Sequence, residues 1–286
     1  MGLFDLFRRR APEPLPEARP QPPPAGGTGH RRLGNDSAGA CDQAQATALA
    51  GLFAVPREQR GPEWLDRYWQ NAWRAAIVVA DPPIATGPDG FPYMRLHLAP
   101  DGSGQPETCL MNTAAEAIEQ GAGAALFARP GADMTEAEYV MPLGVLDSLL
   151  RFGCPEGDPA DLDEMGAGQA TGTGATTLGA GEQILVATPS PDFLSRAAAR
   201  ALHRHLAEDW GLADPRVAIL VSHALRPSRS LVIGVPRSEL IAKGATDDQI
   251  AGWMQRIRWF LPPSRSLMLM PDGWSATEMT RLSELF

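Results

Sequence analysis

The sequence predicts an α+β protein of two domains, of which the C-terminal one is ferredoxin-like. The composition turns from Pro- and Gly-rich to globular near residue 41, and an acidic and Gly-rich stretch interrupts it at 154–182. After that stretch, β-rich runs and helical stripes follow in the order β-α-β-β-α-β, which is typical of a split βαβ sheet with both helices on one face. We therefore expect a disordered tail over 1–40, an α+β domain over 41–153, a linker over 154–182 and the ferredoxin-like domain over 183–286.

The first helix of the C-terminal domain should follow the apolar run at 184–187. Ser190 is a suitable N-cap, and Pro191 suits the first helical position. The helix should end near Gly211. Its buried stripe repeats every three and four residues and comprises Leu194, Ala197, Ala198, Ala201, Leu202, His205 and Leu206.

The next two strands, at 217–221 and 231–235, are separated by a polar turn and should pair as a hairpin. Thr246 and Gln249 match a capping box, which predicts a second helix. That helix should end before Pro262-Pro263, because proline cannot continue it. A strand at 267–270 and a closing helix over 275–285 complete the domain. The stripe of the second helix is Ile250, Trp253, Met254, Ile257 and Leu261.

Alternation along the four strands divides their side chains between two faces. The bulkier set should lie under the helices: Ile184, Val186, Val217, Ile219, Val221, Leu231, Ile233, Val235, Leu267 and Leu269. The second set is smaller but still apolar: Leu185, Ala187, Ala218, Leu220, Ser222, Val232, Gly234, Met268 and Met270. We expect this second face to be covered by the N-terminal domain, a second copy of the chain or a partner, and cover by the chain itself is favoured.

The N-terminal domain should begin with helices at 43–54 and from Pro62. The second helix carries an apolar stripe of Leu65, Trp69, Ala72, Trp73, Ala76 and Ile77, with Trp64 and Tyr68 beside it, and such a stripe indicates core packing. A turn-rich loop at 81–90 should follow. Strands are expected at 93–98, 108–111, 122–128 and 138–141, with one short helix capped by Thr113 and another at 142–152.

The order of the C-terminal elements, with Pro262-Pro263 before the last strand, resembles the C-terminal domain of the SseB family, named for enhanced serine sensitivity. Residues 107–152 resemble that family's N-terminal domain more loosely, through Thr113-Ala-Ala-Glu116, Gly121–Phe127 and Pro130-Gly131. The resemblance is one of pattern and carries no catalytic signature. It implies a bacterial protein and favours a non-enzymatic role.

Composition argues against several function classes. The net charge of −9 disfavours general nucleic-acid binding, which needs a basic surface. RNA-binding sheets of this kind need aromatic side chains on their open face, and the four expected strands carry none. The three cysteines, Cys41, Cys109 and Cys154, are too widely spaced for a disulfide framework or a CxxC site. We therefore expect a cytoplasmic protein with no cofactor and no metal.

Catalytic motifs are not recognisable in the sequence. The glycines at 172–174 fit neither a dinucleotide-binding nor a phosphate-binding loop, and no nucleophile elbow or zinc-binding helix motif occurs. His203 and His205 lie two residues apart on a helix and so point in nearly opposite directions. With Asp209 one turn further on, His205 is expected to be a buried, hydrogen-bonded histidine.

The first ten residues combine apolar and basic side chains, which is the composition of a small membrane-surface anchor. The candidate contact residues are Leu3, Phe4, Leu6, Phe7, Arg8, Arg9 and Arg10. Myristoylation is not indicated, because Leu6 stands where Ser or Thr is needed. Either a weak peripheral contact with the inner membrane or a frayed, solvated start fits this segment.

The sequence as a whole favours a non-catalytic protein-interaction or regulatory module, whose partner is an unknown protein or a second copy. Trp259 lies on the polar side of its expected helix beside Arg256, a composition typical of interaction hot spots. The candidate interaction residues are Trp259, Arg256, Met268 and Met270. Cover of Trp259 by the closing helix or the other domain is the open alternative. A peripheral membrane adaptor and an enzyme without a recognisable motif are the other two hypotheses.

Overall fold

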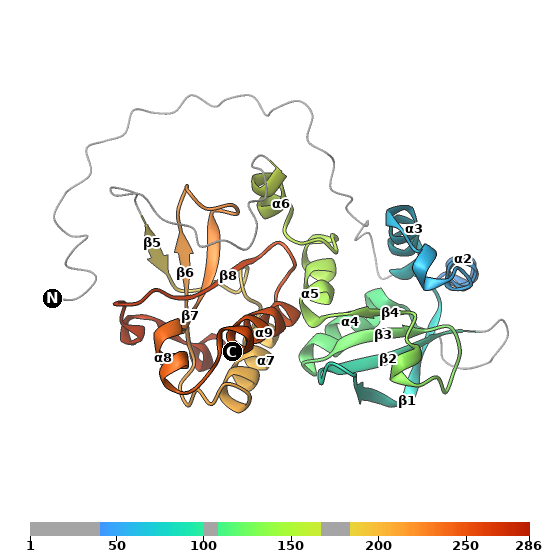
Figure 1. The fold of residues 1–286 in the computed structure, drawn as a ribbon. Coiled ribbons are helices and arrows are strands. Elements are labelled where there is room, and N and C mark those ends of the chain that lie inside the picture. Colours follow the sequence, from blue (N-terminus) through green and yellow to red (C-terminus); the bar gives the residue numbers. More distant parts are fainter. Residues whose placement is uncertain (1–40, 100–107, 167–183) are drawn as a thin grey trace, which may run out of the picture.

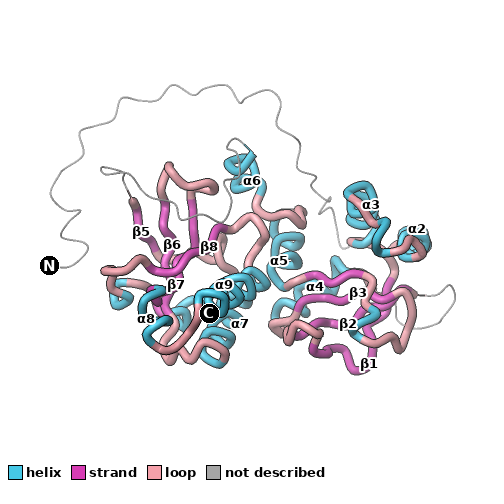
Figure 2. Tube along the Cα trace, viewed as in Figure 1, coloured by secondary structure: helices cyan, strands magenta, loops and turns pink. Residues whose placement is uncertain are grey.

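The computed structural model describes residues 41–99, 108–166 and 184–286. Over these ranges the chain is mixed α+β, with two mixed sheets (Figures 1 and 2). The expected tail over 1–40 and most of the glycine-rich stretch lie outside the described residues. No helix within the described ranges is long and apolar enough to cross a membrane.

The first sheet has the order β1-β2-β3-β4 and carries helices on one face. Its strands are β1 (Ile77–Thr86), β2 (Pro92–Leu98), β3 (Gly123–Phe127) and β4 (Tyr139–Met141), and only β2 and β3 run parallel. The helices are α2 (Gln43–Phe53), α3 (Pro62–Ala72), α4 (Leu110–Glu119) and α5 (Leu143–Phe152). The α2 prediction and the start of α3 at Pro62 are confirmed, and Asp42 caps α2 through its carboxylate. The predicted end of α3 is too late, because Ala76 of the expected stripe lies beyond the helix and Ile77 begins β1.

Three local predictions in this half are wrong. Residues 81–86, expected in a loop, belong to β1, because the strand continues past a bulge between Val79 and Ile84 and pairs with β2 again. The strand expected at 108–111 is a single bridge at Thr108 followed by α4. Thr113 lies inside α4, where its hydroxyl bonds the carbonyl of Cys109, so it does not cap the helix.

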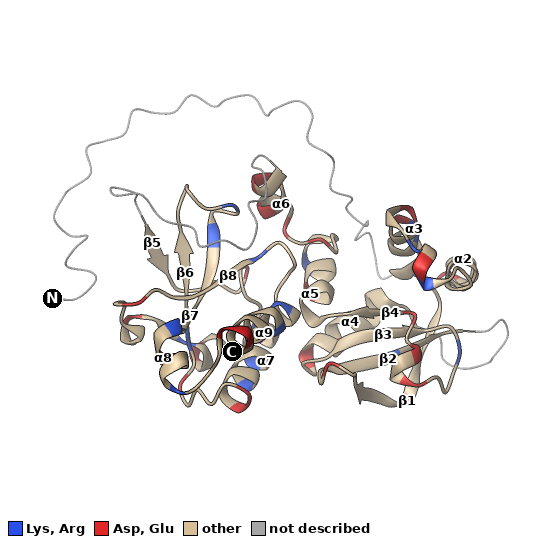
Figure 3. Ribbon diagram, in the orientation of Figure 1, with Lys and Arg blue, Asp and Glu red and all other residues tan. Residues whose placement is uncertain are grey.

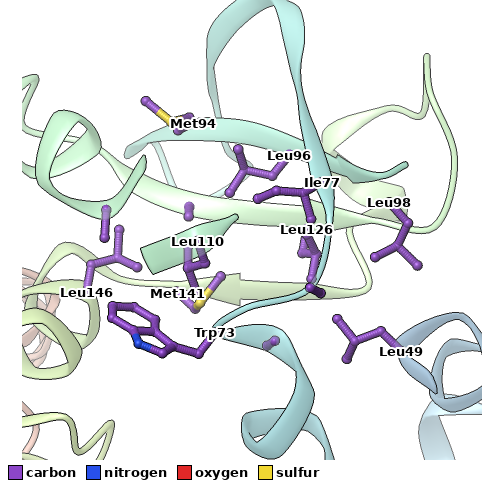
Figure 4. Packing of buried hydrophobic residues seen from close by; sticks show 14 of the residues in the cluster. Leu49, Trp73, Ile77, Met94, Leu96, Leu98, Leu110, Leu126, Met141 and Leu146 are labelled. Atoms are coloured by element: carbon purple, nitrogen blue, oxygen red, sulfur yellow. The ribbon is translucent and has the colours of Figure 1, made fainter. Parts of the chain in front are cut away.

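The core of the first half lies between the sheet and its helices. Figure 4 shows Leu49 of α2, Trp73 at the end of α3 and Leu146 of α5 directed toward strand residues of the sheet. The aromatic stripe of α3 is also in this core, with Tyr68 0% exposed and stacked on Trp64. The core interpretation of that stripe is confirmed.

The second sheet has the order β5-β6-β7-β8. Its strands are β5 (Leu185–Ala187), β6 (Arg216–Val221), β7 (Arg229–Pro236) and β8 (Ser266–Met270), and the short β9 (Thr280–Arg281) also pairs with β6. The helices are α7 (Arg196–Glu208), α8 (Arg237–Ala242) and α9 (Asp247–Ile257). The hairpin of β6 and β7 and the capping box of α9 agree with the sequence.

The strand order corrects the ferredoxin-like prediction. In a split βαβ sheet, strands joined by a helix run parallel with another strand between them. Here β5 and β6, which α7 connects, are neighbours and run antiparallel. The order of elements along the chain fits both arrangements, because it does not say which strands are neighbours. The structure therefore supports a mixed α+β half with a different topology.

Three further features of the second half differ from the prediction. Ser195, not Ser190, caps α7, because residues 190–194 form a turn that buries Phe193 and Leu194. The closing helix expected over 275–285 is replaced by two 3-10 turns, Ala276–Glu278 and Leu282–Leu285, around β9. Pairing of β9 with β6 takes up backbone groups that a helix would need. The short α8 was not predicted.

The division of side chains between the two faces is confirmed for β6, β7 and β8. Val217, Leu231 and Ile233 pack under the helices, whereas Ala218, Leu220 and Val232 lie on the opposite face. The assignment for β5 is wrong by one residue, because Val186 pairs with Leu220 and Leu185 with Val221. Ile184 and Val186 therefore lie on the face of the methionines.

One core cluster crosses from the first half to the second. It joins Phe91, Tyr93, Phe127 and Leu143 of the first half to residues of α7, α9 and the segment after α9. Gly144 of α5 lies directly on the backbone of Leu261, and a Cβ atom there would overlap the carbonyl of Leu261. The two sheets are therefore packed through a shared apolar layer.

The close approach at Gly144 predicts that Gly144→Ala destabilises the protein. Because the added methyl group would meet backbone atoms, we expect the free energy of unfolding to fall by about 1–3 kcal/mol, as at other overpacked sites. Gly51→Ala is the matched control. Nothing lies near a Cβ at Gly51 in α2, so this change should stabilise by roughly 0.5–1 kcal/mol. Urea unfolding midpoints measure both, and equal midpoints for the two variants would contradict the packing.

Candidate functional site

Trp259 lies inside the chain, at the contact between its two halves. It belongs to the 3-10 turn Arg258–Phe260 after α9 and is 6% exposed. Its indole nitrogen donates a hydrogen bond of 2.8 Å to the hydroxyl of Tyr93, and its ring stacks on Phe91 at a centroid distance of 4.5 Å. The prediction of Trp259 as a surface hot spot is corrected, because the first half of the chain covers it.

The hydroxyl of Tyr93 both donates and accepts a hydrogen bond in this contact. It donates a 2.5 Å hydrogen bond to Asp89 while accepting one from Trp259. Asp89 also accepts a bond from the backbone of Phe91, which fixes the turn between β1 and β2. Burial raises the pKa of Tyr93 far above its ordinary value, and the bond to Asp89 adds to this. Tyr93 is therefore an uncharged structural donor at neutral pH.

Arg256 remains at the surface beside the same contact. Its guanidinium lies 4.8 Å from the centroid of the Phe91 ring, as in a cation–π interaction. The side chain is exposed, unlike that of Trp259. Arg256 therefore borders the contact between the halves from outside.

His205 is a buried, hydrogen-bonded histidine, as the sequence predicted. Its Nδ1 pairs with Asp209, and its ring lies 5.1 Å from that of Phe260. Burial lowers the pKa of His205, nearby Arg256 lowers it further, and Asp209 opposes both. Its Nε2 atom has no hydrogen-bond partner among the described residues. A neutral imidazole fits this apolar site.

The buried His205 predicts a specific pH dependence of stability. Because its folded pKa is below 6.5, the unfolded chain takes up the proton first as pH falls below that value. Stability is therefore lost on acidification, with a slope from this group of at most about 1.4 kcal/mol per pH unit. We expect His205→Gln to flatten the wild-type curve between about pH 6.5 and 5. The free energy of unfolding is measured by urea unfolding at each pH. The same pH dependence in wild type and in His205→Gln would contradict this assignment.

The methionine face of the second sheet is only partly covered. Met270 is 5% exposed and Met268 is half-buried. The chain's own Trp274, Ala276 and Met279 pack on this face, as the favoured alternative expected. Six partly buried apolar residues pack against its buried centre: Ile184, Val186, Leu225, Met268, Trp274 and Ala276. Leu185, at the outer strand β5, is 62% exposed. Met268 therefore remains accessible, whereas Met270 does not.

A buried ionic cluster, which the sequence analysis missed, lies at the start of β7 and β8. The helix α6 (Pro159–Gly166) forms where a linker was expected, and Asp161 within it is 1% exposed. Asp161 pairs with Arg265, whose side chain is 0% exposed, and with Arg229 at 2.7 Å. Figure 3 shows acidic residues on α6. The linker prediction for 154–182 is thus wrong for 154–166.

The signal for this helix is present in the sequence. Asp158, Asp161 and Glu164 recur every three residues, which places them close together on one side of a helix. The sequence nevertheless predicts a linker here, because the arginine partners of these carboxylates lie more than sixty positions further along the chain.

Catalytic groups do not converge elsewhere among the described residues. Burial raises the pKa of the Cys154 thiol to about 11, so the thiol is protonated and unreactive at neutral pH. A groove of about 410 Å³ lies beside α2, but four of its nine lining residues are alanine and its Arg129 is paired with Glu136. No group of metal-ligating side chains occurs within the described ranges. The membrane-contact candidates at 3–10 lie outside those ranges.

Comparisons with known proteins give no match: no family model, no curated protein and no solved structure is similar to this chain. The SseB resemblance therefore stays a proposal carried by the sequence pattern alone.

Proposed function

We propose that the chain is a protein-interaction or regulatory module of the SseB-like kind, without catalysis, acting in the bacterial cytoplasm. The observation that carries this proposal is the set of six partly buried apolar residues that pack against the buried centre of the methionine face. Exposed apolar surface that is contiguous and rimmed by polar groups is typical of a binding site for another protein.

The chemistry of this face suits an adaptable partner contact. Met268 has a flexible, polarisable side chain that can adjust to different partner surfaces. Trp274 supplies a large aromatic surface of the kind that contributes most to interface energies. The partner on this account is a protein with a complementary apolar patch, and a second copy of the chain is the other candidate.

A charge introduced on this face tests the proposal. Met268→Glu and, separately, Val186→Glu, both at partly buried positions of this face, should weaken the association by roughly 30-fold, because loss of an interface anchor costs about 2 kcal/mol. Val140→Glu is the matched control, since Val140 is 44% exposed on an outer strand of the other sheet.

The measurement is a quantitative pull-down from native lysate, with sedimentation velocity to detect self-association. Retention of the same partner by all three folded variants would contradict the proposed surface. Absence of any association with the wild-type chain in both assays would contradict the proposed function.

A further inference from the structure

The helix α6 is held in place by charge and not by an apolar core. Asp161 is its one buried residue, and Leu162 and Met165 are only partly covered. Its contacts with the second sheet run through Asp158, Asp161 and Glu164. A segment attached in this way binds like a polar ligand, since its attachment depends on complementary charge and on hydrogen bonds.

The second half of the chain supplies the arginines and serines that bind these carboxylates, and within the segment the backbone nitrogen of Ala160 also donates to Asp158 at 3.0 Å. Arg265 binds Asp161 through one terminal nitrogen and Asp158, at 3.1 Å, through the other. Arg229 reaches Asp161 at 2.7 Å and Asp158 at 3.4 Å.

Two serines complete this arrangement. The Ser228 backbone nitrogen and hydroxyl donate to Glu164 at 2.5 and 3.1 Å. The Ser264 hydroxyl accepts a bond from the backbone of Asp158 at 2.9 Å and contacts Asp161 at 3.4 Å. Each of the three carboxylates thus meets a donor that comes from the second half.

Close packing as well as charge defines this site. The guanidinium carbon of Arg265 lies 4.4 Å from the ring centroid of Phe193 and 5.9 Å from that of Phe152, so two aromatic rings contact the cation. Arg265 is 2% exposed, and its Nε atom has no partner among the described residues, which leaves one donor in the site unused. Gly157, at φ +140°, lies so close to Ser264 that a Cβ would overlap the serine side chain.

We propose that Arg229, Arg265, Ser228 and Ser264 form a binding site for an acidic peptide segment, and that residues 157–164 are its internal occupant. A partner segment with carboxylates at the same spacing can replace the internal one, because little apolar burial opposes its release. The internal segment acts at an effective concentration of about millimolar, so the site is closed until a partner competes. This site uses other side chains than the methionine face and does not depend on the proposed function.

Binding of a labelled peptide tests this site. The probe is a fluorescent peptide of residues 155–166, and its control carries Asn and Gln in place of the three carboxylates. The full-length variant Asp158→Asn, Asp161→Asn, Glu164→Gln should bind the acidic probe at least about tenfold more tightly than wild type, because its own segment no longer competes. Binding should weaken as salt increases, and the control peptide should not bind.

Two further variants keep the test decisive if the triple variant does not fold. Gly157→Ala weakens the docking of the internal segment by steric overlap and leaves every charge in place, so it should also gain binding of the acidic probe. Adding Arg229→Gln, at a side chain that is 35% exposed, should remove that gain. A folded variant that binds neither peptide, or that binds both equally, would overturn the proposal.

Discussion

The indole of Trp259 joins the two halves of this protein. It stacks on Phe91 at the tip of the β1–β2 hairpin and donates a hydrogen bond to Tyr93 on β2. Buried aromatic side chains contribute large apolar areas, and Trp259 also satisfies its polar nitrogen here. The positions of α9 and of α7 relative to the first sheet depend on this contact. The shared core, which continues through Leu143 and Leu261, extends the same layer.

The composition of the chain suggests two independent domains, but this shared apolar layer joins them. The Gly-rich and acidic composition suggests a flexible linker. The segment from Cys154 to Gly166 is instead folded against the second sheet. Its carboxylates pair with Arg229 and Arg265 at the start of β7 and β8. The first half therefore meets the second through an apolar layer and through this ionic cluster, and the exposed pair of Glu119 on α4 and Arg200 on α7 adds a further contact.

Local signals in the sequence predicted local structure well. The capping box at Thr246 and the alternation in β6 and β7 depend on neighbouring residues and agree with the structure. Strand order could not be predicted, because the same sequence of helices and strands is compatible with several arrangements of the strands in the sheet. The partner of Trp259 lies 166 positions away and could not be identified from spacing. The candidate site was predicted in part, since Met268 stays accessible while Met270 and Trp259 are buried.

The central claim of this account is that the two halves form one cooperative body through Phe91 and Trp259. Native-state hydrogen exchange of wild type and Phe91→Ala tests it most directly. Loss of a buried phenylalanine costs about 3–5 kcal/mol. If the halves are coupled, the slowest amides of α7 and α9 should lose protection by a similar amount to those of β2. Unchanged protection in α7 and α9, with loss confined to the β1–β2 hairpin, would show that the halves are independent.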